Sequence, residues 1–142
     1  MKIYIAGSSK EYILVASYIQ KVEAMGHRVT QDWTEAIRAH GAANDASVPR
    51  QSQKYHAELD LVGIEDAHLI WFICPELDSK GMWVELGYAL AIKRMLSRFK
   101  MVTLIASGNT KQCIFLAGID LLHHYETHDL ALESIKSTYK GF

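Results

Sequence analysis

Hydrophobic positions along the chain alternate between short continuous runs and longer runs with helical spacing. Residues 2–6 (KIYIA), 68–74 (HLIWFIC) and 101–106 (MVTLIA) are apolar runs of strand length. Such runs are typical of strands that are covered on both faces of a parallel sheet. Shorter strands are predicted at residues 27–33 and near residues 121–126.

Helices are predicted between these strands, because apolar residues recur there every three or four positions. The predicted helices span residues 10–25, 50–65, about 81–97 and about 129–139. Gly26 directly follows the first of them and is a typical helix stop. Residues 34–49 lack such a pattern and carry Gly41 and Pro49, so we expect an irregular excursion there.

This alternation of strands and helices indicates an α/β fold with three layers, α/β/α, built on a small doubly wound parallel sheet of about five strands. Right-handed crossovers favour the flavodoxin-like strand order 2-1-3-4-5. The 142 residues fit a single domain, 1–142. Ligands of such sheets bind at the carboxyl ends of the strands, so we expect the chemistry in residues 7–10, 31–34, 75–81 and 107–112.

Composition narrows the function classes. The net charge is −1 and the calculated pI is about 6.6, so the basic excess of a polynucleotide-binding protein is missing. No run approaches the ~20 apolar residues that cross a bilayer. The N-terminus enters a strand-like run at once, without the pattern of a signal peptide. We therefore expect neither a polynucleotide nor a membrane as a partner.

The cysteines and histidines point away from metal chemistry. Cys74 and Cys113 are the only cysteines and lack CxxC spacing, which is typical of reduced thiols in a cytoplasmic protein. The seven histidines form no metal-binding motif, and His123-His124 alone is not a metal site. We expect no metal and no other cofactor.

The stretch 78–89 (DSKGMWVELGYA) follows the central strand and opens a helix at the expected ligand-binding edge. We place Glu85 near the first helical turn, where the helix dipole favours the ionised carboxylate. An ionised carboxylate is a competent nucleophile, and Gly81 would let a ligand approach the backbone closely. The dipole alone also favours a glutamate at such a position, so position by itself does not assign a catalytic role.

Residues 81–89 resemble the Gly-x-x-x-Glu-[Leu/Ile/Phe]-Gly-x-Ala signature of the nucleoside 2-deoxyribosyltransferase family, which includes 2′-deoxynucleoside 5′-monophosphate N-hydrolases. Residues 3–8 (IYIAGS) are similar to the first strand and substrate loop of that family. Asp60 stands at the spacing of the family's acid, and residues 116–127 resemble the ends of small bacterial and phage members. The resemblance spans nearly the whole chain.

The resemblance implies three catalytic residues. Glu85 would attack C1′ of the sugar and form a glycosyl-enzyme intermediate, as in a retaining glycosidase. Asp60 would hydrogen-bond the base and protonate it as it leaves, and burial near Glu85 would raise its pKa. Tyr4 would hold the Glu85 carboxylate in line. Without the resemblance, Asp60 is a solvent-facing helical residue and Tyr4 a packing residue of the strand; we expect His56 and Glu58 to be solvated.

The resemblance also bears on the substrate. Many transferases of free nucleosides carry an Asp six residues before the nucleophile, whereas here that residue is Ser79, as in the hydrolases, where a Ser binds the 5′-phosphate. Lys80 and the helix N-terminus would assist Ser79, which could otherwise merely cap the helix. The other expected substrate-binding residues are Gly7, Ser8, Ser9, Lys10, Trp33, Gly81 and Met82. Residues 7–10 are a weaker anion cradle because such turns often use small residues for geometry alone, and Trp33 would either stack on a base or pack in the core.

The expected function is cleavage of the N-glycosidic bond of a 2′-deoxyribonucleoside or its 5′-monophosphate, with transfer of deoxyribose to a free nucleobase. The alternative is hydrolysis by water, and a TIR-like NAD glycohydrolase or a non-catalytic nucleotide sensor would use the same fold. The resemblance also implies a homo-oligomer. The excursion at residues 34–49 is our candidate for a lid over the site.

Overall fold

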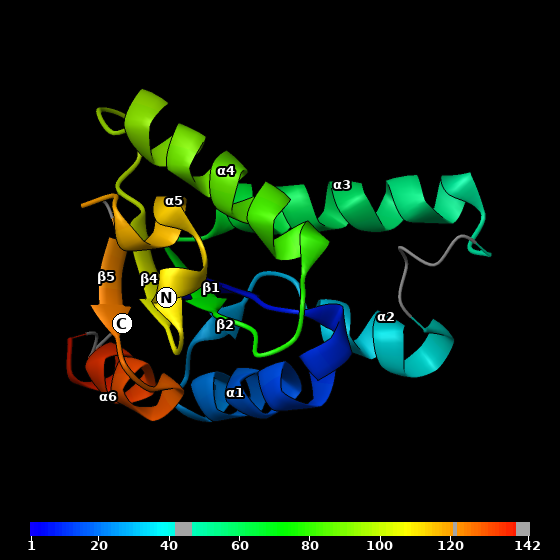
Figure 1. Ribbon diagram of the computed structural model, residues 1–142, viewed down its shortest axis with the longest axis horizontal. Coiled ribbons are helices and arrows are strands. Elements are labelled where there is room, and N and C mark those ends of the chain that lie inside the picture. The colour runs from blue at the N-terminus through cyan, green and yellow to red at the C-terminus, as the bar shows by residue number, and fades with distance from the viewer. Residues whose placement is uncertain (42–46, 121, 139–142) are drawn as a thin grey trace.

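A parallel sheet of five strands runs through the centre of the computed structural model, with helices on both faces (Figure 1). The structure describes residues 1–41, 47–120 and 122–138. The strands lie in the order β2-β1-β3-β4-β5, and each adjacent pair is parallel. The predicted α/β architecture and the order 2-1-3-4-5 are confirmed.

The long elements have the predicted bounds to within two residues. The strands are β1 (Lys2–Ala6), β2 (Arg28–Val29), β3 (Leu69–Ile73), β4 (Thr103–Ser107) and β5 (Leu122–Tyr125). The helices are α1 (Tyr12–Ala24), α2 (Trp33–His40), α3 (Arg50–Asp66), α4 (Lys80–Met95), α5 (Ile114–Ala117) and α6 (His128–Thr138). Two 3₁₀ turns, η1 (Ser9–Glu11) and η2 (Thr110–Gln112), follow β1 and β4.

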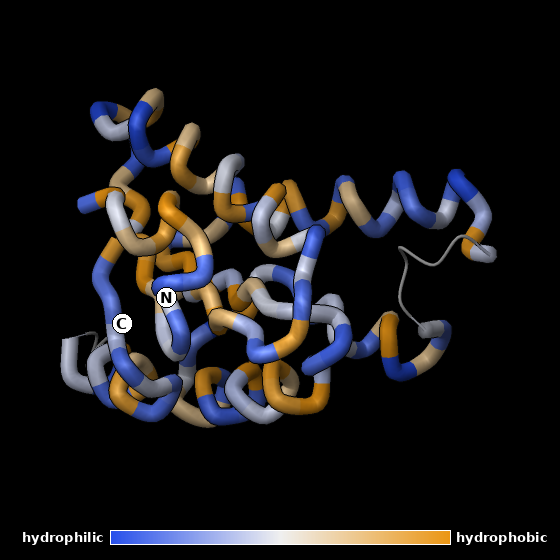
Figure 2. The backbone as a smooth tube through the Cα atoms, in the orientation of Figure 1, coloured by the Kyte–Doolittle hydropathy of each residue, from blue (hydrophilic) through white to orange (hydrophobic). Residues whose placement is uncertain are grey.

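Alternation of side chains along β1 divides the core into two layers. Tyr4 and Ala6 pack in the cluster that α3, α4 and α5 cover, whereas Ile3 and Ile5 pack against α1 and α6. This is the period of two that any strand imposes. Figure 2 shows hydrophobic residues along the strands, while the end of α3 that projects beyond the sheet is mostly hydrophilic. Tyr4 is thereby directed toward α3 and α4.

The helix α2 corrects the prediction of an irregular excursion at residues 34–49. Asp32 caps this helix, since its Oδ1 accepts a hydrogen bond from the backbone N–H of Thr34 at 3.0 Å. Gly41, with a φ of 80°, follows the last helical residue. The predicted strand at 27–33 is correspondingly shorter, because β2 covers only Arg28–Val29. Residues 42–46 of the predicted excursion lie outside the described residues.

The connection between β4 and β5 contains two short elements, η2 and α5, that the sequence pattern did not predict. The helix α5 has only four residues, too few to display helical periodicity. Its Leu116 is fully buried in the core beneath α4. Residue 121, where β5 was predicted to begin, lies outside the described residues.

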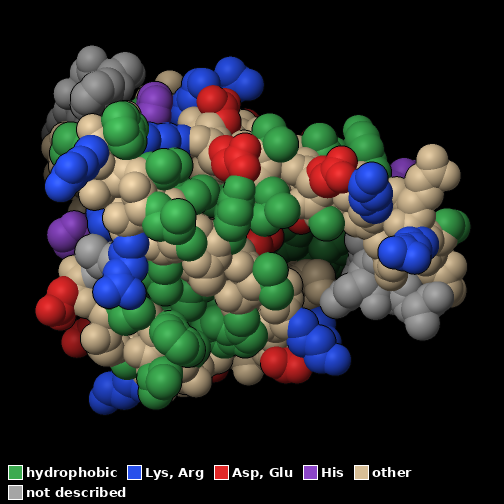
Figure 3. All heavy atoms as spheres, turned by 90° about the horizontal axis from the view of Figure 1, so that it is seen from above, with side chains coloured by type: hydrophobic (Ala, Val, Ile, Leu, Met, Phe, Trp, Pro, Cys, Tyr) green, Lys and Arg blue, Asp and Glu red, His purple; other side chains and the backbone are tan. Residues whose placement is uncertain are grey.

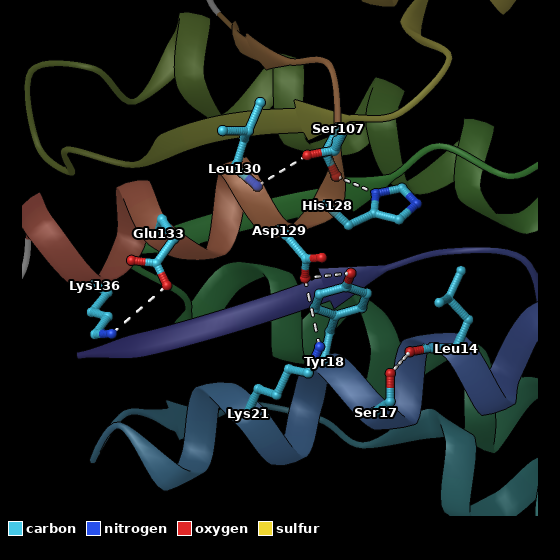
Figure 4. Close-up of polar contacts among 11 residues, drawn as sticks. Leu14, Ser17, Tyr18, Lys21, Ser107, His128, Asp129, Leu130, Glu133 and Lys136 are labelled. Atoms are coloured by element: carbon cyan, nitrogen blue, oxygen red, sulfur yellow. Dashed lines mark hydrogen bonds and ion pairs between the residues drawn. The ribbon is translucent and has the colours of Figure 1, made fainter.

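Polar contacts join α1 to α6 on the face of the sheet opposite to α3 and α4 (Figure 4). The Tyr18 hydroxyl donates to Asp129 Oδ1 at 2.9 Å, and Lys21 lies 3.6 Å from the same oxygen. His128 Nδ1 lies 2.7 Å from Ser107 Oγ, which also accepts a hydrogen bond from the indole N–H of Trp71. These contacts attach α6 to the end of β4 and to α1.

The face formed by α3 and α4 has a different character. Viewed from that side, hydrophobic side chains cover much of the surface (Figure 3). Exposed hydrophobic residues of α3, α4 and α5 include Val62, Val84, Met95, Ile114 and Phe115. No helix within the described ranges is both long enough and apolar enough to span a membrane.

Candidate active site

A cleft of about 570 Å³ lies at the carboxyl ends of β1 and β3. Its walls come from the β1–η1 turn, from α2 and α3, and from the β3–α4 connection with the first turns of α4. Ten of the twelve predicted site residues line it: Gly7, Ser9, Lys10, Trp33, Asp60, Ser79, Lys80, Gly81, Met82 and Glu85. The chain therefore brings together residues that are up to 78 positions apart, from Gly7 to Glu85, at the expected edge of the sheet.

Tyr4 does not line the cleft itself but contacts Glu85, which does. The Tyr4 hydroxyl donates a hydrogen bond of 2.7 Å to Glu85 Oε1. Tyr4 is fully buried and its ring lies against Gly63 of α3, where a Cβ would come within 3.0 Å of the ring. The glycine therefore makes room for the tyrosine, and the tyrosine orients the glutamate.

The protonation of Glu85 differs from the sequence expectation. Because α4 begins at Lys80, Glu85 lies in the second helical turn, where the helix dipole acts weakly. Burial raises the pKa of Glu85 to about 8; the hydrogen bond from Tyr4 opposes this shift and the charge of Asp60 adds to it. Desolvation thus outweighs the dipole, and the Glu85 carboxyl is largely protonated at pH 7 when the cleft holds no ligand.

Asp60, on α3, faces the same cleft from the other side. Burial raises the pKa of its carboxyl to about 6, the direction the sequence predicted. Its Oδ1 is the one buried side-chain oxygen or nitrogen among the described residues that has no hydrogen-bond partner. Since a buried polar atom without a partner is costly, a ligand that hydrogen-bonds to Asp60 Oδ1 would gain that energy. The atom is therefore a candidate contact for a ligand in the cleft.

The β3–α4 connection supplies polar groups at the rim. Ser79 is buried and caps α4, because its Oγ accepts a hydrogen bond from the backbone N–H of Met82 at 3.3 Å. This leaves the Ser79 hydroxyl proton for a ligand. The next two N–H groups, of Lys80 and Gly81, are first-turn donors that the helix itself does not use. The cleft is open at Gly81, where a Cβ would meet no atom within 4 Å.

Ser8 and Trp33 have structural contacts that the sequence did not reveal. Ser8 is buried and does not line the cleft: its Oγ accepts from the Lys10 N–H at 3.2 Å and donates to the Asp78 carbonyl at 3.1 Å. Trp33 is the first residue of α2 rather than the end of a strand, and its indole N–H donates to the Ile5 carbonyl at 2.8 Å. Trp33 is thus a lining residue whose ring is fixed by a hydrogen bond to the backbone, and Ser8 is a structural residue that joins the β1–η1 turn to the β3–α4 connection.

His56 is a cleft residue that the sequence analysis missed. We expected it to be solvated, but it is half-buried and lines the cleft with Asp60. The two stand four positions apart on α3 and so share one helix face, which was the available signal. Ala36 and Ile37 of α2 were also missed, whereas none of the described residues 107–112 lines the cleft.

The lining residues also bear on metal binding. Within the described parts of the chain, no group of three or more His, Cys, Asp or Glu side chains is placed to hold a metal ion. Three acids line the cleft, Asp60, Asp78 and Glu85. Of these, Asp60 and Glu85 are the two that the sequence analysis predicted as acid and nucleophile.

Comparison with known proteins places this architecture. No protein-family model matches the chain, and a search of curated proteins finds no significant match. Solved structures do match, and two of them are similar over 96% of this chain. One is a 2-deoxyribosyltransferase from Bacillus psychrosaccharolyticus, with a TM-score of 0.64, 20% identity and 90% of that protein covered. The other is a CMP N-glycosidase from Clostridium botulinum, with a TM-score of 0.57, 17% identity and 98% covered.

This chain has their fold. The resemblance that rested on residues 81–89 is therefore confirmed at the level of the fold, over nearly the whole length of all three chains. In that fold, the signature residues Gly81 and Glu85 lie at the cleft, and Asp60 lies across it.

Proposed function

We propose that the protein is a member of the nucleoside 2-deoxyribosyltransferase family and cleaves the N-glycosidic bond of a 2′-deoxyribonucleoside or its 5′-monophosphate. One observation carries the proposal: a glutamate held by a buried tyrosine shares a cleft with an aspartate whose buried oxygen lacks a partner. Two carboxyl groups with different environments are what a retaining glycosidic mechanism needs. The two structural neighbours, a deoxyribosyltransferase and an N-glycosidase, support the same reaction class.

In the proposed reaction Glu85 is the nucleophile. Its carboxylate attacks C1′ and forms an ester, while the C1′–N bond breaks and its electron pair leaves with the base. Asp60 donates its proton to the departing ring nitrogen or to another ring atom of the base. An acceptor then attacks C1′ from the opposite side and releases Glu85, and its proton returns to Asp60. Tyr4 keeps the Glu85 carboxylate in place through its hydrogen bond to Oε1.

The pKa values of the pair constrain the pH dependence. The reactive form needs an ionised Glu85 and a protonated Asp60, whereas burial raises the pKa of Glu85 to about 8 and that of Asp60 to about 6. At pH 7 the dominant form therefore has a protonated Glu85 and an ionised Asp60. The reactive form carries the same single proton, but on Asp60, so one proton transfer within the cleft converts one form into the other. kcat/KM should follow a bell whose limbs reflect apparent pKa values of the pair near 6 and 8.

The rim of the cleft favours a substrate with a 5′-phosphate. Ser79 retains a hydroxyl proton, the helix does not use the N–H groups of Lys80 and Gly81, and the side chains of Lys10 and Lys80 are exposed beside them. A phosphate is well bound by such a combination of donors and cations. Asp78, which also lines the cleft, is the residue that would oppose the phosphate or contact a sugar hydroxyl instead.

A trapping experiment tests the nucleophile. The protein is incubated with 2-fluoro-2-deoxynucleosides and their 5′-monophosphates, denatured, digested and analysed by mass spectrometry. We expect a fluorodeoxyribosyl adduct on the peptide that contains Glu85, and no adduct in Glu85→Gln. An adduct on another residue, or turnover that survives in Glu85→Gln, would overturn the assignment.

The identity of the acceptor is a second question, since either a nucleobase or water can capture the intermediate. Transfer of deoxyribose to another base is our first proposal, and hydrolysis is the alternative that the N-glycosidase neighbour favours. Deoxynucleosides and deoxynucleotides are incubated with and without free adenine, and the products are resolved by chromatography. A new adenine deoxynucleoside or deoxynucleotide identifies a transferase; free sugar or sugar phosphate in both mixtures identifies a hydrolase. Consumption of NAD without deoxynucleoside turnover would favour the TIR-like alternative.

We also propose that the chain forms a homo-oligomer. Met95 of α4 and Phe115 of α5 are exposed, and Figure 3 shows many hydrophobic side chains on one face of the molecule. Exposed apolar surface is typical of a contact between subunits when it forms a large patch. Light scattering coupled to gel filtration should give a mass that is a multiple of 16.0 kDa, and a mass of one chain at micromolar concentration would contradict the proposal.

A further inference from the structure

The β3–α4 connection, which carries Asp78 and Ser79, has no regular secondary structure, and its middle is exposed. Glu76, Leu77 and Asp78 are all exposed, whereas Pro75 and Ser79 on either side of them are buried, and Ser79 caps α4. A segment with so few buried contacts would be expected to fluctuate. Yet the proposed phosphate-binding groups of Ser79 and Lys80 depend on its position. Something must therefore hold the connection in place.

The side chain of Glu11 makes two of the contacts that hold it. Glu11 ends the 3₁₀ turn η1 that follows β1, and it is half-buried. Its Oε1 accepts a hydrogen bond from the backbone N–H of Glu76 at 3.3 Å, and its Oε2 accepts one from the N–H of Leu77 at 3.1 Å. One carboxylate thus binds two successive amides of the connection, 65 and 66 positions away.

Two further bonds complete the attachment. Ser8, from the same turn as Glu11, donates to the carbonyl of Asp78 at 3.1 Å. Gln112, from η2 on the other side, donates through Nε2 to the carbonyl of Pro75 at 2.6 Å. Residues 75–78 are therefore each held by one side-chain hydrogen bond, and Glu11 supplies the two that are charge-assisted, the stronger kind.

We propose that Glu11 is a positioning residue that fixes the β3–α4 connection so that Ser79 and the first amides of α4 face the phosphate of the substrate. This rests on the proposed function, and in particular on binding of a 5′-monophosphate. Glu11 does not line the cleft, so it acts through the connection and not by touching the ligand. Nothing in the sequence motif around Glu85 points to it.

The proposal predicts an effect whose sign is opposite to that of simple electrostatics. Glu11 carries a negative charge near the proposed phosphate site, so if charge were its only influence, removing the charge would tighten phosphate binding. If Glu11 positions the connection, removing the charge weakens it. Glu11→Gln keeps the length but loses the charge, and its amide nitrogen cannot accept from a backbone N–H. Glu11→Asp keeps the charge but is one methylene too short to reach both amides.

The experiment compares wild type, Glu11→Gln, Glu11→Asp and the control Glu23→Gln, which changes an exposed glutamate on α1. Affinity for inorganic phosphate is measured by NMR titration, and KM and kcat are measured for deoxynucleoside 5′-monophosphates and for the matching nucleosides. We expect both Glu11 variants to bind phosphate about tenfold more weakly, the scale of one charge-assisted hydrogen bond. KM for monophosphates should rise by the same factor, with kcat and the values for nucleosides changed less than threefold.

Hydrogen exchange gives a readout that does not depend on turnover. In both Glu11 variants the amides of Glu76 and Leu77 should exchange at least tenfold faster than in wild type, while Glu23→Gln should match wild type. Equal exchange rates, or phosphate binding that stays the same or tightens in Glu11→Gln, would overturn the proposal. Failure of the proposed function would look different, because wild type itself would then neither bind phosphate nor cleave any deoxynucleotide.

Discussion

Replacing the proposed nucleophile should abolish turnover and at the same time stabilise the fold. In Glu85→Gln the amide has nearly the same shape, and its oxygen can still accept the hydrogen bond that Tyr4 donates to Glu85. What the substitution removes is an ionisable group in a desolvated place. Burial raises the pKa of Glu85 from its ordinary value of 4.5 to about 8. The native protein must therefore take up a proton at this position when it folds at neutral pH.

The size of the effect follows from that shift. In the unfolded chain Glu85 is ionised above pH 4.5, whereas in the folded chain it stays protonated up to pH 8. At pH 7 the gap of two and a half pH units, at about 1.4 kcal/mol per unit, costs the folded state roughly 3–4 kcal/mol. Glutamine has no such cost. Glu85→Gln should therefore unfold at a temperature roughly 12–16 °C above wild type at pH 7, given about 4 °C per kcal/mol for a domain of this size.

The pH dependence provides the check. A carboxyl whose pKa is raised by folding destabilises the folded state only above the pKa that the carboxyl has in the unfolded chain. For Glu85 this loss in the free energy of unfolding is absent below pH 4.5, grows between pH 4.5 and 8, and is constant above pH 8. Urea unfolding of both proteins at pH 4, 5.5, 7 and 8.5 measures the difference in the free energy of unfolding. A difference that is the same at pH 4 and pH 8.5 would refute the reasoning, and so would a glutamine variant less stable than wild type at pH 7.

Three further predictions concern the neighbours of Glu85. Tyr4→Phe removes the hydrogen bond that lowers the pKa of Glu85. The limb of the kcat/KM profile that reports Glu85 should therefore move up by about one pH unit, and the plateau rate should fall about tenfold. A limb that does not move would contradict the contact. Asp60→Asn removes the proposed acid, so kcat should fall at least 100-fold and the limb of the pH profile near pH 6 should disappear. The fall in kcat should be largest for substrates whose bases are poor leaving groups. A bell-shaped profile that stays intact would exclude Asp60 as the acid. Gly63→Ala places a methyl group 2.8 Å from Gln31 Cβ and 3.0 Å from the Tyr4 ring. The free energy of unfolding, measured by thermal unfolding, should therefore fall by roughly 1–3 kcal/mol. An unchanged melting temperature would show that the neighbouring side chains move aside without cost.

Local chemistry was sufficient to predict most of the fold. The apolar runs of β1, β3 and β4 and the helical spacing of α1, α3, α4 and α6 each lie within a few successive residues, so their pattern is visible without the third dimension. The handedness of crossovers then leaves few strand orders, and the observed one was among them. Two shorter helices were not predicted. The helix α2 depends on a capping hydrogen bond to Asp32, and α5 has too few residues to show a helical period.

The site divides in the same way. The motif at residues 81–89 pointed to Glu85 because its signal is contiguous, and the alternation along β1 placed Tyr4 on one face of the sheet. The resemblance had already pointed to Asp60, but only the tertiary structure placed His56 in the same cleft. Only the structure shows that Ser8 and Glu11 hydrogen-bond to the β3–α4 connection and do not line the cleft. The protonation of Glu85 belongs with these. Its pKa depends on how much water the assembled layers exclude, and that exclusion outweighs the helix dipole on which a reading of the sequence relies.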